Sequence, residues 1–328
     1  MKTFGKDILI SVLLGVVLPA MVLSVFLRTE KKTVTDSPTE SSLSIGVLDG
    51  VERERIHIPV LRDHGEIQTM ELEEYLCGVI LAEMPVDFEP EALKAQAVVS
   101  RTYALRRYSK GTKHPQGAVC TDPSCCQGYM TEEEFENRGG VATDILKVSQ
   151  AVQATAGEVL MYRDELIDAT YFSCSGGRTE DAQSVWGSDV AYLQAVDSPG
   201  EDAAAYHTDE TVFTPEQIEQ ALSLNLTGEP DHWFRVLSLT DGNGVKEIDI
   251  CGYVFTGVEV RKALGLRSSA FSVIVNDSDV IFQTKGYGHR VGMSQYGADA
   301  MALSGSSYDQ ILAHYYQGTK LTQYHQND

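Results

Sequence analysis

Residues 8–27, ILISVLLGVVLPAMVLSVFL, carry no charged side chain over twenty consecutive positions. At a rise of about 1.5 Å per residue, a helix of this length would span the hydrocarbon core of a bilayer. A cleaved signal peptide is the alternative, but the run is longer than the usual apolar core of a signal peptide and no A-x-A-like cleavage site follows it. The sequence therefore predicts a transmembrane anchor over residues 1–28. Lysine and arginine flank both ends, so the flanks assign no orientation, but either interpretation places most of the chain outside the cytoplasm.

The next stretch, residues 29–50, begins with TEKKTVTDSPTESSLSI and has the Ser/Thr/Glu/Lys-rich composition of a flexible linker. Residues 51–328 are predicted to form the folded domain, since 43% of the chain is apolar and can build a core. Within it, residues 200–265 have the weakest pattern and are predicted to be a sub-domain or an insertion. The net charge of −21 argues against nucleic acid as a partner, because phosphate binding needs clustered Lys and Arg.

Short alternating segments and amphipathic helices follow one another along this domain, which predicts an α+β fold. Residues 56–70 indicate a hairpin that turns at positions 63–65, with Pro59 on an edge strand. A helix must end at Met84, ahead of Pro85, and Pro90 begins the next helix.

In that next helix, one face carries the small or apolar residues Leu93, Ala97, Ser100 and Ala104, which would let another backbone approach closely. Near the C-terminus, a helix over residues 293–304 ends at Gly305. The Ser307–Gln310 capping box opens the last helix.

Glu83 interrupts the apolar stripe of the first helix. At about 100° per residue it falls among Leu72, Leu76, Val79 and Ile80. A glutamate at the edge of the core that reaches solvent or pairs with an arginine is the ordinary interpretation. A carboxyl desolvated by apolar neighbours has a raised pKa, however, and can act as a general acid near neutral pH.

One histidine and three cysteines lie within thirteen residues of the segment HPQGAVCTDPSCC: His114, Cys120, Cys125 and Cys126. Imidazole and thiolate are the ligands that zinc prefers. Disulfides are the alternative, since an extracytoplasmic chain with six cysteines invites pairing. Adjacent cysteines seldom serve one ion together, so at most one of Cys125 and Cys126 is expected at the site. The residues alone leave zinc and disulfide open.

Two glycine-rich segments, ATYFSCSGGRT and GYGHRVGMSQYGA, carry scattered polar side chains. The glycines, among them Gly176 and Gly177, would let the backbone approach a ligand, and Tyr, His, Ser and Gln suit the hydroxyl and N-acetyl groups of a sugar. The sequence contains no G-x-S-x-G or H-E-x-x-H motif, so serine hydrolase and common metallopeptidase chemistry find no support. A nucleotide cofactor is not expected either, because the glycines near residue 288 miss the dinucleotide fingerprint.

Four blocks that follow the anchor, YLCGVILAEMP, EALKAQAVVSRTYAL, YFSCSGGRTE and KGYGHRVGMSQYGADAMA, resemble in their order the stage II sporulation protein D family. The resemblance covers roughly residues 50–328 and extends to the amidase-enhancer proteins. It implies a membrane-anchored lytic transglycosylase that cleaves peptidoglycan during engulfment of the forespore, with a glycan-binding cleft.

The resemblance also assigns roles. The catalytic glutamate of the family falls on Glu83. The zinc ligands fall on His114, Cys120 and Cys126, with Cys125 as the alternative to Cys126, and the zinc is expected to be structural. The remaining candidates are expected to line the cleft as substrate-binding residues: Arg101, Tyr171, Ser173, His289 and Gln295.

A lytic transglycosylase needs one carboxyl group that acts first as an acid and then as a base, which agrees with the absence of an equally placed second carboxylate near Glu83 in the sequence. The family implies two protein partners, the amidase called sporulation protein P and sporulation protein M. It implies a location in the mother-cell membrane, with the catalytic domain facing the intermembrane space. The acidic charge favours strands stripped of their acidic peptides. The other function that the resemblance allows is that of a non-catalytic glycan-binding protein that recruits or activates an amidase.

Overall fold

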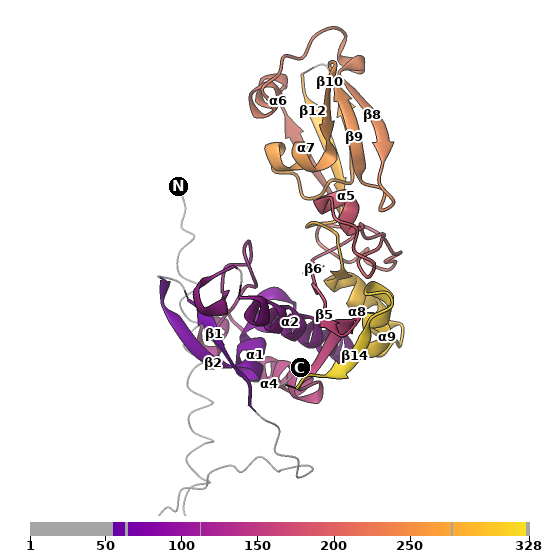
Figure 1. Ribbon diagram of the computed structural model, residues 1–328. Helices are drawn as coiled ribbons and strands as arrows, with labels where there is room; N and C mark the ends of the chain where they lie inside the picture. Colours follow the sequence, from indigo (N-terminus) through magenta and orange to yellow (C-terminus); the bar gives the residue numbers. More distant parts are fainter. Residues whose placement is uncertain (1–54, 63–64, 112, 277, 326–328) are drawn as a thin grey trace, which may run out of the picture. The chain divides into compact units, whose positions relative to one another are not determined.

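The computed structural model describes residues 55–62, 65–111, 113–276 and 278–325 (Figure 1). These residues form a mixed α+β fold, as predicted. The predicted anchor and linker, residues 1–28 and 29–50, lie outside the described residues. Within the described ranges, no helix combines the length and the apolar character that a membrane crossing requires.

The predicted hairpin is present, with strand β1 (His57–Leu61) antiparallel to β2 (Ile67–Glu71). The prediction that Pro59 lies on an edge strand is wrong, because β1 is the middle strand of the order β2-β1-β3. Strand β3 (Val119–Cys120) is only two residues long and pairs with Val60 and Leu61 alone. Pro59 has no N–H to donate, but it comes before these two residues and so does not have to pair with β3.

Two helices form the centre of the first core. Helix α1 (Leu72–Glu83) ends where the sequence predicts, and the N–H of Met84 donates to Ile80. Helix α2 (Pro90–Lys110) begins at Pro90, and its predicted small-residue face is completely buried. Helix α2 makes its most extensive contacts with α1, α4 (Ala142–Ala154), β4 (Glu158–Tyr162), α8 (Gln295–Leu303) and α9 (Tyr308–Tyr315).

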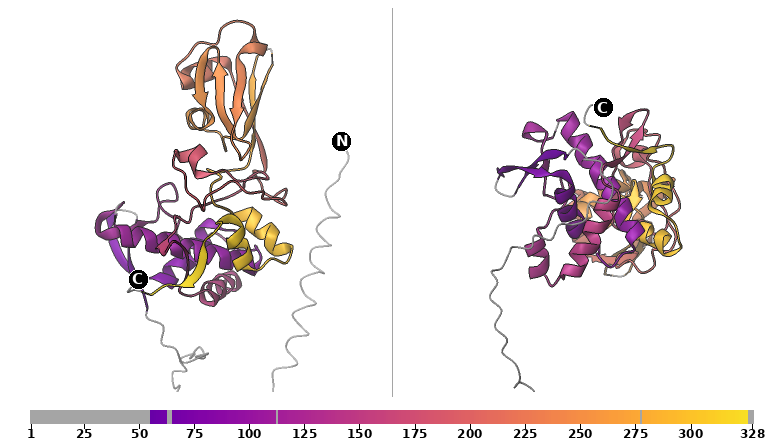
Figure 2. Two further views of the ribbon diagram at one scale, coloured as in Figure 1. Left: turned by 45° about the vertical axis from the view of Figure 1, so that its right-hand side comes forward. Right: turned by 90° about the horizontal axis from the view of Figure 1, so that it is seen from below.

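The C-terminal helices α8 and α9 return to the start of α2, which is more than 200 residues earlier in the chain (Figure 2). Asp299 of α8 accepts a hydrogen bond from the N–H of Glu89 at 2.7 Å, and Glu91 accepts one from the N–H of Tyr308 at 2.9 Å. The predicted capping box at the start of α9 is present. These bonds close the first core around α2.

Short strands complete this core, and one of them carries the predicted site residue Tyr171. Strand β6 (Tyr171–Phe172) runs parallel to β13 (Met293–Ser294), so the two glycine-rich segments of the sequence lie side by side. Strand β4 lies between β14 (Lys320–Gln323) and β5 (Glu165–Leu166). The other elements of this part are short: the 3-10 turn η2 (Pro115–Gly117) and helices α3 (Glu132–Asn137) and α5 (Ala182–Trp186).

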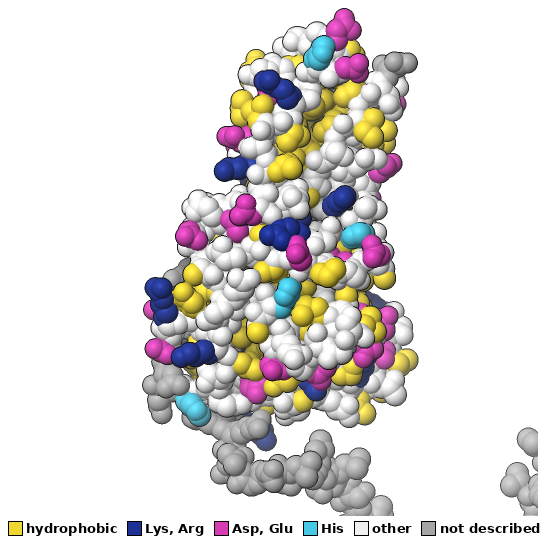
Figure 3. All heavy atoms as spheres, turned by 90° about the vertical axis from the view of Figure 1, so that its right-hand side faces the viewer, with side chains coloured by type: hydrophobic (Ala, Val, Ile, Leu, Met, Phe, Trp, Pro, Cys, Tyr) yellow, Lys and Arg dark blue, Asp and Glu magenta, His cyan; other side chains and the backbone are white. Residues whose placement is uncertain are grey.

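A second apolar core forms between residues 213 and 282, where the fully buried side chains include Ile218, Ile248, Val260 and Phe282. Its two three-stranded sheets are drawn mostly in orange in Figure 1 and have the orders β11-β12-β7 and β10-β9-β8. Hydrophobic side chains remain at the surface of this part (Figure 3). Its elements are β7 (Thr208–Phe213), α6 (Pro215–Leu222), η3 (Pro230–His232), β8 (Phe234–Leu239), β9 (Val245–Ile250), β10 (Tyr253–Thr256), α7 (Gly257–Leu264), β11 (Phe271–Val275) and β12 (Val280–Lys285).

Candidate active site and metal centre

Glu83 is the last residue of α1, and its half-buried carboxylate accepts two hydrogen bonds. One donor is the backbone N–H of Gly128 and the other is the hydroxyl of Tyr171. Burial raises the pKa of Glu83, while these two hydrogen bonds oppose the shift because they favour the charged form. The net direction is upward, which is the direction that a general acid needs at neutral pH.

A directed chain of donors leads to this carboxylate. Tyr75 donates its hydroxyl proton to Gln127 Oε1 at 3.4 Å, and Gln127 Nε2 donates to the Tyr171 hydroxyl at 3.3 Å. Burial raises the pKa of both tyrosines well above the usual range, so both phenols stay protonated. Because the Tyr171 oxygen accepts from Gln127, its own proton is available to Glu83.

Gln295 lies at the same end of α1, and the backbone of Ser173 lies at the start of α8, next to Gln295. Gln295 Nε2 donates to the backbone carbonyl of Glu83 at 3.0 Å, which fixes the helix end that carries the carboxylate. Ser173 follows β6, and its carbonyl accepts from the N–H of Tyr296 at 3.1 Å and from the Ser294 hydroxyl at 3.4 Å. The structure therefore brings Glu83, Tyr171 and Gln295 into one site, with the backbone of Ser173 at the start of α8.

His289 joins the site through the backbone of Tyr171, to which it is hydrogen bonded. Its Nδ1 accepts from the N–H of Val291 at 3.1 Å, which leaves the proton on Nε2. Burial, together with repulsion from the Arg261 guanidinium, lowers the pKa of His289 to about 4. The imidazole is therefore neutral at physiological pH and packs as an aromatic ring against Phe172.

Arg101 does not line a cleft, and this part of the prediction is wrong. Its side chain is completely buried and makes a two-point ion pair with Glu73, at 3.0 Å and 2.6 Å. It also donates to the carbonyls of Val152 and Glu158 and so joins α1, α2, α4 and β4. Glu73 and Glu83 are ten positions apart on α1, about 15 Å along the helix. No signal in the sequence distinguishes a buried arginine from an exposed one here.

The glycine-rich segment after Ser173 binds a carboxylate of the protein itself, in place of the ligand expected from its glycines. Glu201 Oε2 accepts from the N–H and the hydroxyl of Ser175, at 2.7 Å and 2.8 Å, and from the N–H of Gly176 at 2.9 Å. Glu201 is almost fully buried, and the Cys174 thiol and the Ser198 hydroxyl also donate to it. These groups hold the turn that follows β6 in place.

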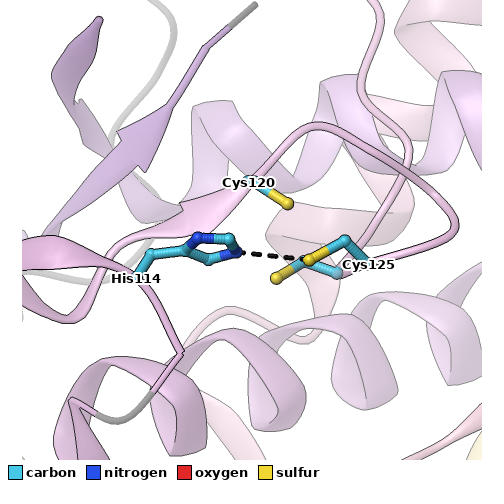
Figure 4. A group of neighbouring side chains, drawn as sticks. His114, Cys120 and Cys125 are labelled. Atoms are coloured by element: carbon cyan, nitrogen blue, oxygen red, sulfur yellow. Dashed lines mark hydrogen bonds between the residues drawn. The ribbon is translucent and has the colours of Figure 1, made fainter. Parts of the chain in front are cut away.

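The candidate metal ligands converge in the loop between α2 and α3. The ligand atoms of His114, Cys120, Cys125 and Cys126 all lie within 4.8 Å of one another. Figure 4 shows the His114 ring directed toward Cys125, with Nε2 at 3.3 Å from Sγ, and the Cys120 sulfur above them. Bonds of about 2.0–2.3 Å to one ion place four tetrahedral ligand atoms within roughly 4 Å of each other, so this donor set fits zinc with little movement.

Both adjacent cysteines belong to this cluster, contrary to the expectation that at most one would. The reason is the turn at Asp122, whose carbonyl accepts the N–H groups of Cys125 and Cys126 at 3.0 Å and 2.8 Å. Burial raises the pKa of the Cys120 thiol to about 12, so a cation would have to displace its proton. The six cysteines of the chain, all among the described residues, form no disulfide.

Sequence reasoning missed Gln127 and Gly128, which lie directly after Cys126. A Cβ on Gly128 would lie 2.9 Å from the carboxylate oxygen of Glu83, so the close approach needs glycine. The only sign of them in the sequence is their position, directly after Cys126, the last of the four candidate metal ligands. The loop that carries the candidate metal ligands, residues 114–126, therefore ends next to Glu83 in the structure.

Comparison with known proteins finds one family model and several relatives that are similar to this chain. The family model "Stage II sporulation protein" (SpoIID) matches residues 62–162, which contain Glu83 and all four candidate metal ligands. The chain is 34% identical over 301 residues to "Stage II sporulation protein D" of Bacillus subtilis, covering 90% of this chain and 86% of that protein. It is 36% identical over 273 residues to the protein of the same name in Bacillus amyloliquefaciens, covering 82% and 79%. It is also 30% identical over 307 residues to the "Amidase enhancer" of B. subtilis, covering 76% of this chain and 40% of that protein.

Proposed function

This chain belongs to the stage II sporulation protein D family, and on that premise we propose that it is a lytic transglycosylase that cleaves peptidoglycan glycan strands during sporulation. The bond cut is the one between N-acetylmuramic acid and N-acetylglucosamine. The observation that carries the proposal is the environment of Glu83, a half-buried carboxyl with a raised pKa at the point where α1, β6 and the start of α8 meet.

Glu83 first acts as the acid. Its neutral form, favoured by burial, gives a proton to the glycosidic oxygen as the bond to C1 breaks. The resulting carboxylate is stabilised by the N–H of Gly128 and the hydroxyl of Tyr171. It then takes the proton from the C6 hydroxyl of the muramyl residue as that oxygen bonds to C1. The product is a 1,6-anhydro sugar, and no water is consumed.

A hydrolytic glycosidase would instead need a second carboxylate, either as the nucleophile or to activate water. Among the described residues, none of the groups that shift the pKa of Glu83 is another carboxylate. The partners of this side chain are an amide N–H and a phenol. A mechanism with one carboxyl group that changes role between the two steps suits this arrangement.

The metal that we propose is zinc, held by His114, Cys120, Cys125 and Cys126. Four protein ligands leave no open position for water or substrate, which is typical of structural zinc. The ion would cross-link the loop that ends next to Gln127 and Gly128. The ion would therefore help to hold Gln127 and Gly128 in position beside Glu83.

We further propose that residues 1–28 anchor the protein in the mother-cell membrane, with the folded domain in the intermembrane space. Its protein partners there are sporulation protein P, an amidase, and sporulation protein M. The net charge of −21 favours strands from which the acidic peptides have been removed. Equal rates on stripped and intact strands would contradict this preference.

A second function is favoured by the similarity to the amidase enhancer. In that case the site holds glycan without cutting it, and the protein recruits or activates an amidase. The two functions differ in what they require of Glu83: an acid is indispensable to the transglycosylase but not to a glycan-binding protein.

The test is mass spectrometry of peptide-stripped glycan digested with the Glu83→Gln variant. The transglycosylase releases products lighter by one water molecule than hydrolytic products, and Glu83→Gln should abolish them. Glu74→Gln, an exposed glutamate on the same helix, is the matched control and should keep full activity. Anhydro products at the wild-type rate from Glu83→Gln would refute the proposed catalytic role.

A further inference from the structure

Trp186 is a large apolar side chain that the fold holds at the surface, with 46% of it exposed. It is one of two tryptophans in the chain and the last residue of α5. Asp181 caps the start of this short helix, and Gly187 ends it in the left-handed conformation with φ +75°. Exposed large aromatic groups are uncommon in folded domains and are enriched at binding sites.

The indole is held by His289. The two ring centroids are 5.2 Å apart and the planes are tilted by 55°. His289 is itself fixed from behind, because its ring packs edge-on against Phe172 at 5.6 Å and its Nδ1 accepts from the N–H of Val291. One side of the indole is thus supported by an imidazole that Phe172 and the N–H of Val291 hold in place, while nearly half of Trp186 stays open to solvent.

The same histidine connects Trp186 to the candidate active site. His289 is hydrogen bonded to the backbone of Tyr171, whose hydroxyl donates to Glu83. Tyr171 and His289 therefore link Glu83 to Trp186 in one chain of contacts. The indole pairs with His289 and not with a group that donates to the Glu83 carboxylate, so a polymer bound at Glu83 would meet it with another of its sugar units.

A second exposed aromatic residue lies on the same loop as His289. Tyr287 is 37% exposed, and its ring packs edge-on against Tyr206 with centroids 5.1 Å apart. The Arg267 guanidinium lies 5.1 Å from the centroid of Tyr287 and 4.3 Å from that of Tyr206. Two partly exposed aromatic rings, Trp186 of α5 and Tyr287 of the His289 loop, are thus each supported by a neighbouring ring.

We propose that Trp186 is a stacking surface for a sugar ring of the glycan strand, at a position removed from the bond that Glu83 cleaves. The inference rests on the proposed function, since it takes the strand as the ligand. The C–H face of a pyranose is apolar and flat enough to cover an indole, and aromatic walls with a few polar groups are typical of such sites. Because it lies away from the reacting atoms, Trp186 sets affinity and the preference for long strands, and leaves the chemical step unchanged.

The experiment measures binding apart from cleavage. Full-length protein in detergent micelles carries Glu83→Gln, so that the strand stays intact, and Trp233→Phe, so that Trp186 is the single fluorescent indole. Titration with peptide-stripped glycan strands should change its emission in a saturable manner. Short chitooligosaccharides that fill only part of the site should bind more weakly. A flat titration at strand concentrations that saturate the wild-type enzyme would overturn the proposal.

Variants then assign the effect to the ring. On the wild-type Glu83 background, Trp186→Ala should raise KM for long strands about ten-fold, the size expected for loss of an aromatic anchor, with kcat unchanged. Trp186→Phe should restore most of the affinity, and Tyr253→Ala, an exposed aromatic of the second core, should change nothing. Wild-type KM for Trp186→Ala would refute the inference. If Glu83 proved not to be catalytic, the fluorescence titration would still decide the role of Trp186, so the two proposals fail separately.

Discussion

Removal of the Tyr171 hydroxyl is the change that most directly tests how the site controls Glu83. Tyr171→Phe keeps the ring that packs beside α1 and deletes one of the two hydrogen bonds to the carboxylate. That bond favours the charged form, so its loss leaves burial opposed by the N–H of Gly128 alone. The pKa of Glu83 must therefore rise further.

The size of the rise follows from the strength of the lost bond. A hydrogen bond to a charged group contributes about 1.5–3 kcal/mol, and one pKa unit corresponds to about 1.4 kcal/mol, so we expect a rise of about one to two units. The variant also leaves Gln127 Nε2 without the acceptor that it has at 3.3 Å. That should lower the free energy of unfolding by about 1–3 kcal/mol.

The assay is the rate of anhydro-product release as a function of pH. Glu83 must be protonated when it meets the strand, so the rate falls as pH rises through its pKa. In Tyr171→Phe this descending limb should move to higher pH by about one to two units. Tyr308→Phe, which deletes a hydroxyl that donates to Glu158 at 3.0 Å and not to Glu83, is the matched control and should leave the limb in place.

A descending limb that stays in place, or that moves to lower pH, would refute this reasoning. The first result would mean that the phenol does not reach the carboxylate in solution. The second would mean that Tyr171 supports the neutral form of Glu83. Loss of all activity with an intact fold would point to a direct role of the hydroxyl, and a titration of Glu83 followed by NMR would then replace the rate assay.

Three further outcomes are expected. Arg101→Met should lower the free energy of unfolding, measured by urea denaturation, by about 3–5 kcal/mol, because it removes the buried ion-pair partner of the half-buried Glu73 carboxylate and the donors to the carbonyls of Val152 and Glu158; a loss below about 1 kcal/mol would contradict this role. Cys125→Ser should reduce zinc retained after dialysis, measured by elemental analysis, whereas Cys251→Ser should retain one equivalent; equal zinc in both would remove Cys125 from the ligand set. Folding raises the pKa of Glu83 above its ordinary 4.5, so its contribution to stability is present below that pH and is lost as pH rises through the folded pKa. Glu83→Gln should therefore raise Tm at pH 7 and leave it unchanged near pH 4. A lower Tm of the variant at pH 7 would contradict an upward shift of the Glu83 pKa.

The sequence by itself determined the features that depend on neighbouring residues. Pro85 and Pro90 set the end of α1 and the start of α2, and the capping box sets the start of α9, because helix ends are decided by backbone groups within one turn. The helical period placed Glu83 among apolar side chains, and in the structure its side chain is half-buried. The short spacing from His114 to Cys126 kept the four metal-binding side chains within reach of one ion.

Only the tertiary structure decided which distant groups meet. Glu83 receives its hydrogen bonds from residues 45 and 88 positions later, and the sequence contains nothing that pairs them. The turn at Asp122 brought both Cys125 and Cys126 to the metal site, and the packing of four elements buried Arg101, which sequence similarity had placed in the cleft. Periodicity and capping act over a few residues, whereas the partner of a polar side chain is settled when the core closes and each buried group must find a donor or an acceptor.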